Sequence, residues 1–104
     1  MPTYVNLFTY TQKGIEHIKE APKRLEVAKR CFAGMGGKLK EFYLVMGRYD
    51  VVIISEAPND ETMTKIALTF GALGNVRSET LRAFTEEEYK KIVDGIPLEG
   101  ECGP

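Results

Sequence analysis

The chain has 104 residues, a formal net charge of -1 at pH 7, and a composition that is 43% hydrophobic and 28% charged. This length and this balance are typical of one soluble domain with a single core. Because Lys and Arg neither predominate nor cluster among aromatic residues, we expect no nucleic-acid partner. No apolar run approaches the roughly 20 residues that a membrane span needs, and no basic leader precedes an apolar segment. We therefore predict a cytoplasmic protein with no membrane partner.

The first half of the chain predicts a strand, a helical segment and a second strand. Residues 3–10 are rich in aromatic and β-branched side chains that alternate between two faces, as in a strand. Residues 14–35 show helical spacing, but Pro22 lacks an amide donor, so we expect one kinked helix or two short ones. Residues 39–46 form the second strand, which places on one face Phe42, Leu44 and Met46, and on the other Leu39, Tyr43 and Val45.

The second half predicts a buried strand, a helix, a further strand and a terminal helix. Residues 51–57 begin with four consecutive β-branched side chains, which favours a central strand that is buried on both faces. The following helix carries an apolar stripe at helical spacing, formed by Met63, Ile66, Ala67, Phe70 and Leu73. Residues 76–84 form the fourth strand. Thr85 and Glu88 then form a capping box, which starts a short helix that reaches about Asp94.

This order of elements is that of a ferredoxin-like split βαβ fold of the α+β class, with a helix added at the C-terminus. We expect an antiparallel sheet in strand order 4-1-3-2, with both long helices on one face. The two central strands, residues 3–10 and 51–57, carry large apolar groups on both faces, so a free monomer would expose a hydrophobic patch. We therefore predict a homo-oligomer, at least a dimer. Residues 1–97 are assigned to this single domain, and residues 98–104 to an irregular tail.

Three segments at matching spacing carry a resemblance to a known family: Gly47-Arg48-Tyr49-Asp50, residues 71–77 and residues 80–84. Together they resemble the GYD-domain family, and the likeness runs from Pro2 to Pro97. The resemblance implies a ferredoxin-like subunit in an assembly of the dimeric α/β-barrel type, which agrees with the expected second subunit. It implies no particular activity and no catalytic residues.

The Gly47 turn places three polar side chains, Arg48, Tyr49 and Asp50, at the mouth of the buried strand. Aspartate is depleted in sheets and needs hydrogen-bond partners when buried. Asp50 therefore either ties down backbone amides near Gly47 or serves a ligand or a proton transfer. Tyr49 is either a packing aromatic or a hydrogen-bond donor to a ligand.

Arg48, Arg77 and Arg82 can bind a carboxylate or phosphate near the rim of the sheet through guanidinium forks. Interfacial salt bridges with acidic residues explain these arginines equally well. His17 is the single histidine, and it has neither a histidine partner at helical spacing nor a cysteine cluster, so we expect no metal site. We also expect no cofactor.

The leading hypothesis is a homo-oligomer that binds a small anionic molecule between the sheet and a partner subunit. Its ligand-binding residues are Arg48, Tyr49, Asp50, Arg77 and Arg82. One alternative is a cofactor-free enzyme in which Asp50 or His17 transfers a proton and Tyr49 or Arg48 stabilises the developing charge. Convergence of Asp50, Tyr49, His17 and an arginine on one cavity would support this alternative. The other is a structural or regulatory oligomerisation module.

Overall fold

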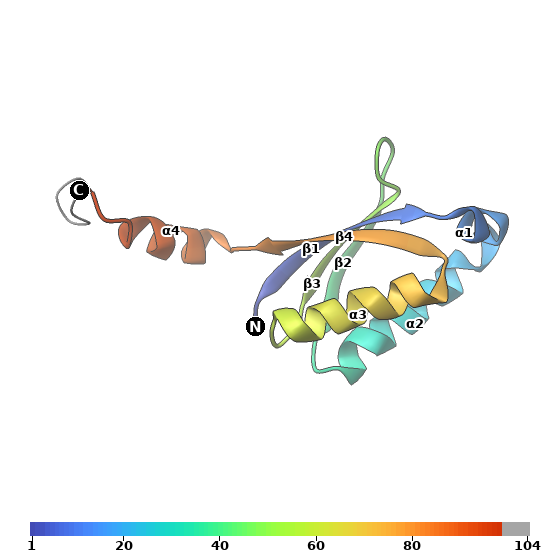
Figure 1. Ribbon diagram of the computed structural model, residues 1–104, viewed down its shortest axis with the longest axis horizontal. Helices are drawn as coiled ribbons and strands as arrows, with labels where there is room; N and C mark the ends of the chain where they lie inside the picture. The colour runs from blue at the N-terminus through green and yellow to red at the C-terminus, as the bar shows by residue number, and fades with distance from the viewer. Residues whose placement is uncertain (99–104) are drawn as a thin grey trace.

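A computed structural model describes residues 1–98, and it shows a four-stranded antiparallel sheet with two long helices against one face (Figure 1). The strands are β1 (Thr3–Tyr10), β2 (Lys38–Leu44), β3 (Val51–Glu56) and β4 (Val76–Ala83). The helices are α1 (Gln12–Glu16), α2 (Ala21–Gly34), α3 (Asp60–Leu73) and α4 (Glu86–Asp94), with a 3-10 turn, η1 (Ile18–Glu20), before α2. The predicted irregular tail lies, apart from Leu98, outside the described residues.

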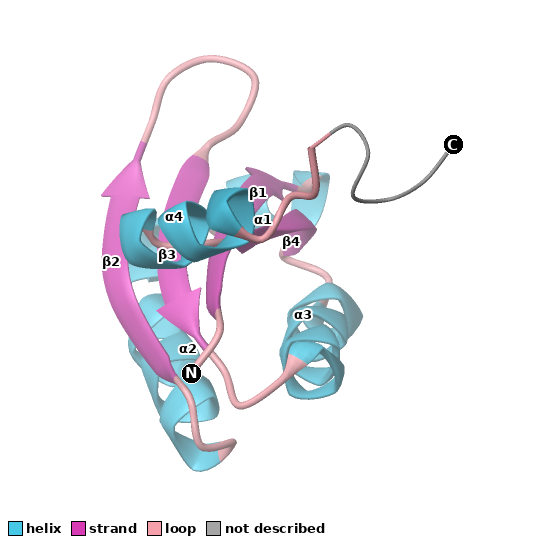
Figure 2. Ribbon diagram, turned by 90° about the vertical axis from the view of Figure 1, so that its left-hand side faces the viewer, coloured by secondary structure: helices cyan, strands magenta, loops and turns pink. Residues whose placement is uncertain are grey.

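The sheet has the order β2-β3-β1-β4, which confirms the predicted central position of β1 and β3. In β1, Tyr4, Asn6 and Phe8 are buried under the helices, and the alternate residues Val5 and Leu7 are half-buried on the opposite face. Helix α2 lies on the β2 side of the molecule and α3 on the β4 side (Figure 2). Among residues 1–98, no helix lies over the face that carries Val5 and Leu7, and we call it the open face (Figure 1).

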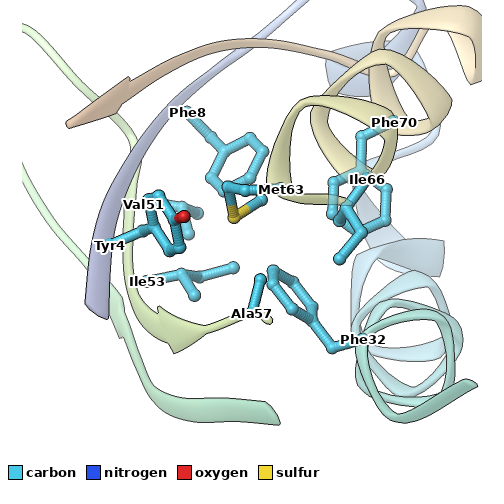
Figure 3. Close-up of a cluster of buried hydrophobic side chains, with 9 residues drawn as sticks. All are labelled: Tyr4, Phe8, Phe32, Val51, Ile53, Ala57, Met63, Ile66 and Phe70. Carbon is cyan, nitrogen blue, oxygen red and sulfur yellow. The ribbon is translucent and has the colours of Figure 1, made fainter. Parts of the chain in front are cut away.

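The core lies between the sheet and α2 and α3 (Figure 3). Phe32 of α2 and Ile66 of α3 are fully buried, and the rings of Phe8 and Phe70 meet edge to face with centroids 6.1 Å apart. Such aromatic pairs contribute beyond their buried area. Of the predicted apolar stripe on α3, Leu73 is half-exposed instead of buried, because the helix ends there at the rim of the sheet.

Two polar side chains are also completely enclosed. The Ser55 hydroxyl donates to the Asn6 side-chain oxygen at 2.6 Å, and the Asn6 amide nitrogen donates to the Thr80 hydroxyl at 3.2 Å. A buried polar group without a hydrogen-bond partner lowers the stability of the fold by about 1–3 kcal/mol. Sliding one strand past another would break these bonds, so they fix the relative positions of β1, β3 and β4.

The helical segment around Pro22 forms two helices, as in the second of the two predicted alternatives. Helix α1 ends at Glu16, and Pro22 lies in the first turn of α2, where an amide donor is not required. The η1 turn joins the two helices.

The second strand differs from the prediction in length and in the faces of its residues. β2 ends at Leu44, and Met46 is 99% exposed in the following loop. A register shift between Leu39 and Glu41 places Leu39 opposite the buried Ser55. Leu39 therefore packs against the core on the helix side, together with Phe42, so the prediction that these two residues lie on opposite faces was wrong.

Helix α4 stands apart from the rest of the fold. It continues from β4 and extends away from the sheet as an arm (Figure 1), which gives the molecule a long dimension of 58 Å against 30 and 21 Å. The predicted capping box is present, since the Thr85 hydroxyl accepts from the Glu88 amide and the Glu88 carboxylate accepts from the Thr85 amide. Among residues 1–98, the helices are too short or too polar to cross a membrane.

The close approach of α1 to the end of α3 gives a test of the fold. A Cβ atom at Gly14 would lie 2.1 Å from the backbone oxygen of Asn75, whereas one at Gly71 would meet no atom within 4 Å. Gly14→Ala should therefore destabilise the protein by about 1–3 kcal/mol through overpacking. Gly71→Ala should stabilise it by about 0.5–1 kcal/mol, because alanine is favoured over glycine inside a helix. Urea unfolding of both variants checks this, and equal stabilities would contradict the described contact.

Candidate functional site

The open face carries a band of apolar side chains from its three neighbouring strands. The pairing of Val5 with Ile54 and Leu81, and of Leu7 with Val52, places these side chains on the same face. We call these five residues the sheet band. Leu81 is 46% exposed, and the other four are half-buried. The sheet band is therefore apolar surface in contact with solvent in the single chain.

The Gly47 turn lies at one end of the sheet, where Asp50 ties two strands together. The Asp50 carboxylate accepts a hydrogen bond from the Tyr10 amide at 2.9 Å, and the Asp50 amide donates to the Phe8 carbonyl at 2.8 Å. The Asp50 carboxylate thus bonds a backbone amide of β1 instead of the amides near Gly47, and it is the Asp50 carbonyl that accepts from the Val45 amide, at 2.8 Å. Gly47 itself has φ of 112°, a conformation that glycine adopts without strain.

Tyr49 reaches across β1 on the open face. Its hydroxyl donates to the Glu79 carboxylate of β4 at 3.0 Å, and this hydrogen bond raises the pKa of Tyr49. The Arg48 guanidinium lies over the Tyr49 ring, 5.6 Å from its centroid. These three side chains border the sheet band at its Gly47 end.

The three candidate arginines lie in two different places. Arg77 pairs with Thr9, which puts it on the same face of β4 as Glu79, and it also lines, together with Arg82, a hollow between α3 and β4. Arg82 is five residues further along β4, roughly 16 Å away, and its register with the buried Tyr4 places it on the helix side. The structure therefore groups Arg48 and Tyr49 at one end of the open face, with Arg77 at the same end of the sheet, and Arg82 lies apart from them along β4.

His17 lies after α1, near Glu20, whose carboxylate is 3.6 Å from its Nδ1 atom. His17 lines a hollow with Lys13, Glu20 and Lys23, and Asp50 is not part of that lining. The structure does not bring the two proposed proton-transfer residues together.

A cleft of about 1050 Å³ separates α3 from β4 on the helix side, and the sequence did not indicate it. At one end, the Tyr4 hydroxyl donates to the Asp60 carboxylate at 2.5 Å. Burial, together with this hydrogen bond, raises the pKa of Tyr4 to about 12, so the hydroxyl stays protonated at neutral pH. The Arg82 guanidinium lies over the rings of Tyr4 and Phe84 and donates to the carbonyl of Ala83. These contacts satisfy Tyr4 and Arg82 within the fold.

The α4 arm presents a second uncovered apolar surface. Residues 44–60% exposed recur at helical spacing on one side of it, Tyr89, Ile92 and Val93, and the equally exposed Ile96 follows just after the helix end. No residue of α4 is buried, and an ion pair of 3.9 Å between Arg82 and Glu88 ties its first turn to β4. A helix of nine residues is marginal in water by itself, so packing of this apolar side would stabilise it.

The four-stranded antiparallel sheet with two long helices on one face defines an α+β protein of ferredoxin-like topology. The GYD domain model matches residues 4–93. A curated relative, the glutamine synthetase and cystathionine beta-lyase binding protein of Thermus thermophilus, is 33% identical over 84 residues, which are 80% of this chain and 88% of the relative. The chain belongs to the GYD domain family.

A solved structure is similar in fold. The crystal structure of TTHA0845 from Thermus thermophilus superposes with a TM-score of 0.53 at 24% sequence identity, covering 82% of this chain and 95% of that one. The prediction of a GYD-type, ferredoxin-like fold is thus confirmed.

The contact between Asp50 and β1 predicts how two substitutions should differ. Asp50→Asn keeps an acceptor oxygen for the Tyr10 amide and should cost about 1 kcal/mol, whereas Asp50→Ala leaves that amide without its partner and should cost roughly 1–3 kcal/mol. Asp94→Ala, at the exposed end of α4, is the matched control and should change stability by less than about 0.5 kcal/mol. Urea unfolding measures all three, and an Asp50→Ala variant as stable as the wild type would contradict the structural role.

Proposed function

We propose that this GYD domain protein is a homo-oligomeric protein-binding module, which associates with itself through the sheet band and contacts a partner protein through the α4 arm. One observation carries the proposal: the chain has two separate apolar surfaces, and each lacks a covering element within residues 1–98. The first lies on a rigid sheet and the second on a projecting helix.

The composition of the sheet band supports self-association. Its five members are all aliphatic, and four of them come from the two central strands, where they form a continuous apolar strip. Soluble monomers rarely expose contiguous apolar patches beyond a few hundred Å². Two copies of a sheet can cover each other face to face with their inner side chains interdigitated. This packing gives an assembly of the dimeric α/β-barrel type.

The amphipathic character of α4 and the name of the Thermus relative both support the proposal that the arm binds a partner protein. The opposite side of α4 carries ion pairs between residues four apart, Glu86 with Lys90 at 3.2 Å and Glu87 with Lys91 at 3.8 Å. A charged side opposite an apolar side is the pattern of a helix that docks into an apolar groove of another protein. The Thermus relative is named for binding two enzymes, and we extend the binding of a partner protein to this chain.

A second candidate function is the binding of a small anion at the Gly47 end of the open face, against the partner subunit. Arg48 and Arg77 form no ion pair within residues 1–98, which favours this site over one at Arg82, whose guanidinium is already bonded. Tyr49 and Asp50 would then border the anion, as the sequence suggested.

The role of the sheet band is tested by a substitution that introduces a carboxylate into it. Leu7→Glu should dissociate the assembly to an 11.7 kDa monomer, because two like charges would meet in an apolar contact. Leu68→Glu is the matched control, since Leu68 is 68% exposed on α3, away from the open face. Sedimentation velocity at micromolar concentration should show at least a dimer for the wild type and the control. A monomeric wild type would refute self-association.

The role of the arm is tested with defined proteins. Purified glutamine synthetase and cystathionine β-lyase from the organism that encodes this chain serve as probes in biolayer interferometry. If either binds, Ile92→Glu should weaken binding at least tenfold without changing the oligomeric state, and Lys90→Gln, on the charged side of α4, should have little effect. Binding that is unchanged in Ile92→Glu would exclude the arm as the contact surface.

A further inference from the structure

An apolar groove of about 630 Å³ lies on the helix side, between α2 and the sheet, and it belongs to neither surface of the proposed function. Its walls are formed by aliphatic and aromatic side chains, among them Ile18, Leu25, Phe42, Phe70 and Leu73. Its size is within the range of small-molecule sites, roughly 300–1,000 Å³.

The groove exists because α2 packs tightly at only one end. Phe32, near the C-terminus of α2, is fully buried in the core, whereas Leu25 and Ala28 nearer its start border the groove. Phe42 and Leu73 on the opposite walls remain 37% and 53% exposed. The fold therefore leaves apolar walls open to solvent at this place.

The mouth of the groove is basic. A smaller hollow shares Arg24, Val27 and Asn75 with the groove and is lined in addition by Lys13, His17, Glu20 and Lys23. Its lining holds three cationic side chains against one carboxylate, and that carboxylate, Glu20, already faces His17 at 3.6 Å. Since the whole chain carries a net charge of -1, this cationic excess is local.

Arg24 is oriented at the junction of the two hollows. Its guanidinium donates to the carbonyl of His17 at 3.0 Å and to that of Gly14 at 3.4 Å. Within residues 1–98, Arg24 and Lys23 form no ion pair with a carboxylate, so their charges are available to an anion.

We propose that the groove and its basic mouth form a binding site for an anionic amphiphile, an apolar chain with a carboxylate head. The chain lies along the walls between Leu25 and Phe70, where burial of apolar surface drives binding. The carboxylate lies at the mouth, beside Arg24 and Lys23, where a charge-assisted hydrogen bond fixes its direction. The positive charge at the mouth selects an anionic head group over a neutral or cationic one. The site lies within one chain, so it does not depend on the oligomeric state.

Isothermal titration calorimetry with decanoate, at concentrations below micelle formation, tests the ligand class on the full chain. We expect decanoate to bind at least tenfold more tightly than decyltrimethylammonium, which has the same chain and the opposite charge, and than hexanoate, which has the same head and a shorter chain. No binding of decanoate, or equal binding of the cationic amphiphile, would overturn the proposal.

Three variants locate the site. The double variant Lys23→Gln/Arg24→Gln should weaken decanoate binding at least fivefold, while Lys29→Gln, a cation on the same helix that pairs with Glu26 at 3.2 Å, should leave it unchanged. Ala28→Phe should block the groove. Val27→Asp, at a half-exposed position on the shared rim, adds a like charge without altering the core and should weaken decanoate binding at least tenfold.

These variants also identify other occupants. If Val27→Asp and the double variant bind decanoate like the wild type, the ligand lies elsewhere and the proposal fails. A further outcome is that the wild type binds no decanoate while the Ala28→Phe protein sediments differently from the wild type. In that case a second copy of the chain fills the groove, and the proposal is overturned as well.

Discussion

The structure depends on one geometric constraint: two helices pack on the same side of a four-stranded sheet, and within residues 1–98 no element covers the other side. β1 and β3 are central in the sheet, so their side chains alternate between a core under α2 and α3 and an open face. The sequence gives both sets an apolar character, with Tyr4 and Phe8 inward and Val5 and Leu7 outward. The same alternation that builds the core thus also builds the surface to which we assign self-association.

The Gly47 turn illustrates how an architectural contact borders that surface. Asp50 holds the end of β3 against β1 through the Tyr10 amide, and the adjacent Tyr49 then extends across the open face to Glu79. Tyr49 and Asp50, which are adjacent in the sequence, therefore join three strands at one end of the sheet. Arg48, stacked on Tyr49, adds a cation to the rim of the sheet band.

Local pattern in the sequence predicts the elements of this fold well. The run of β-branched residues from Val51 identifies a central strand, and Thr85 with Glu88 identifies the start of α4. The hydrogen-bond partners of polar side chains are harder to predict from the sequence, because they are distant along the chain. Tyr10 lies 40 residues from Asp50, and no local pattern connects them.

Other features depend on tertiary geometry that periodicity does not encode. The register shift in β2 moves Leu39 to the helix side, although its spacing from Phe42 predicts opposite faces. The cleft beside β4 and the groove beside α2 depend on the angles at which helices pack, and these angles follow from many contacts at once. The separation of Arg77 from Arg82 is different, because their spacing of five residues on a single strand already predicts opposite faces, and only the position of Arg48 depends on the tertiary structure.

Carbene footprinting of the wild-type protein at micromolar concentration measures most directly whether the open face is covered in solution. Two residues of the same chain serve as internal standards for the extent of labelling: Phe32, which is fully buried, and Met46, which is 99% exposed. We predict that Val5, Leu7 and Ile54 are labelled almost as weakly as Phe32, since a second subunit excludes the reagent from them. Labelling of these three side chains well above that of Phe32, with no increase on dilution to nanomolar concentration, would contradict an assembly through the sheet band.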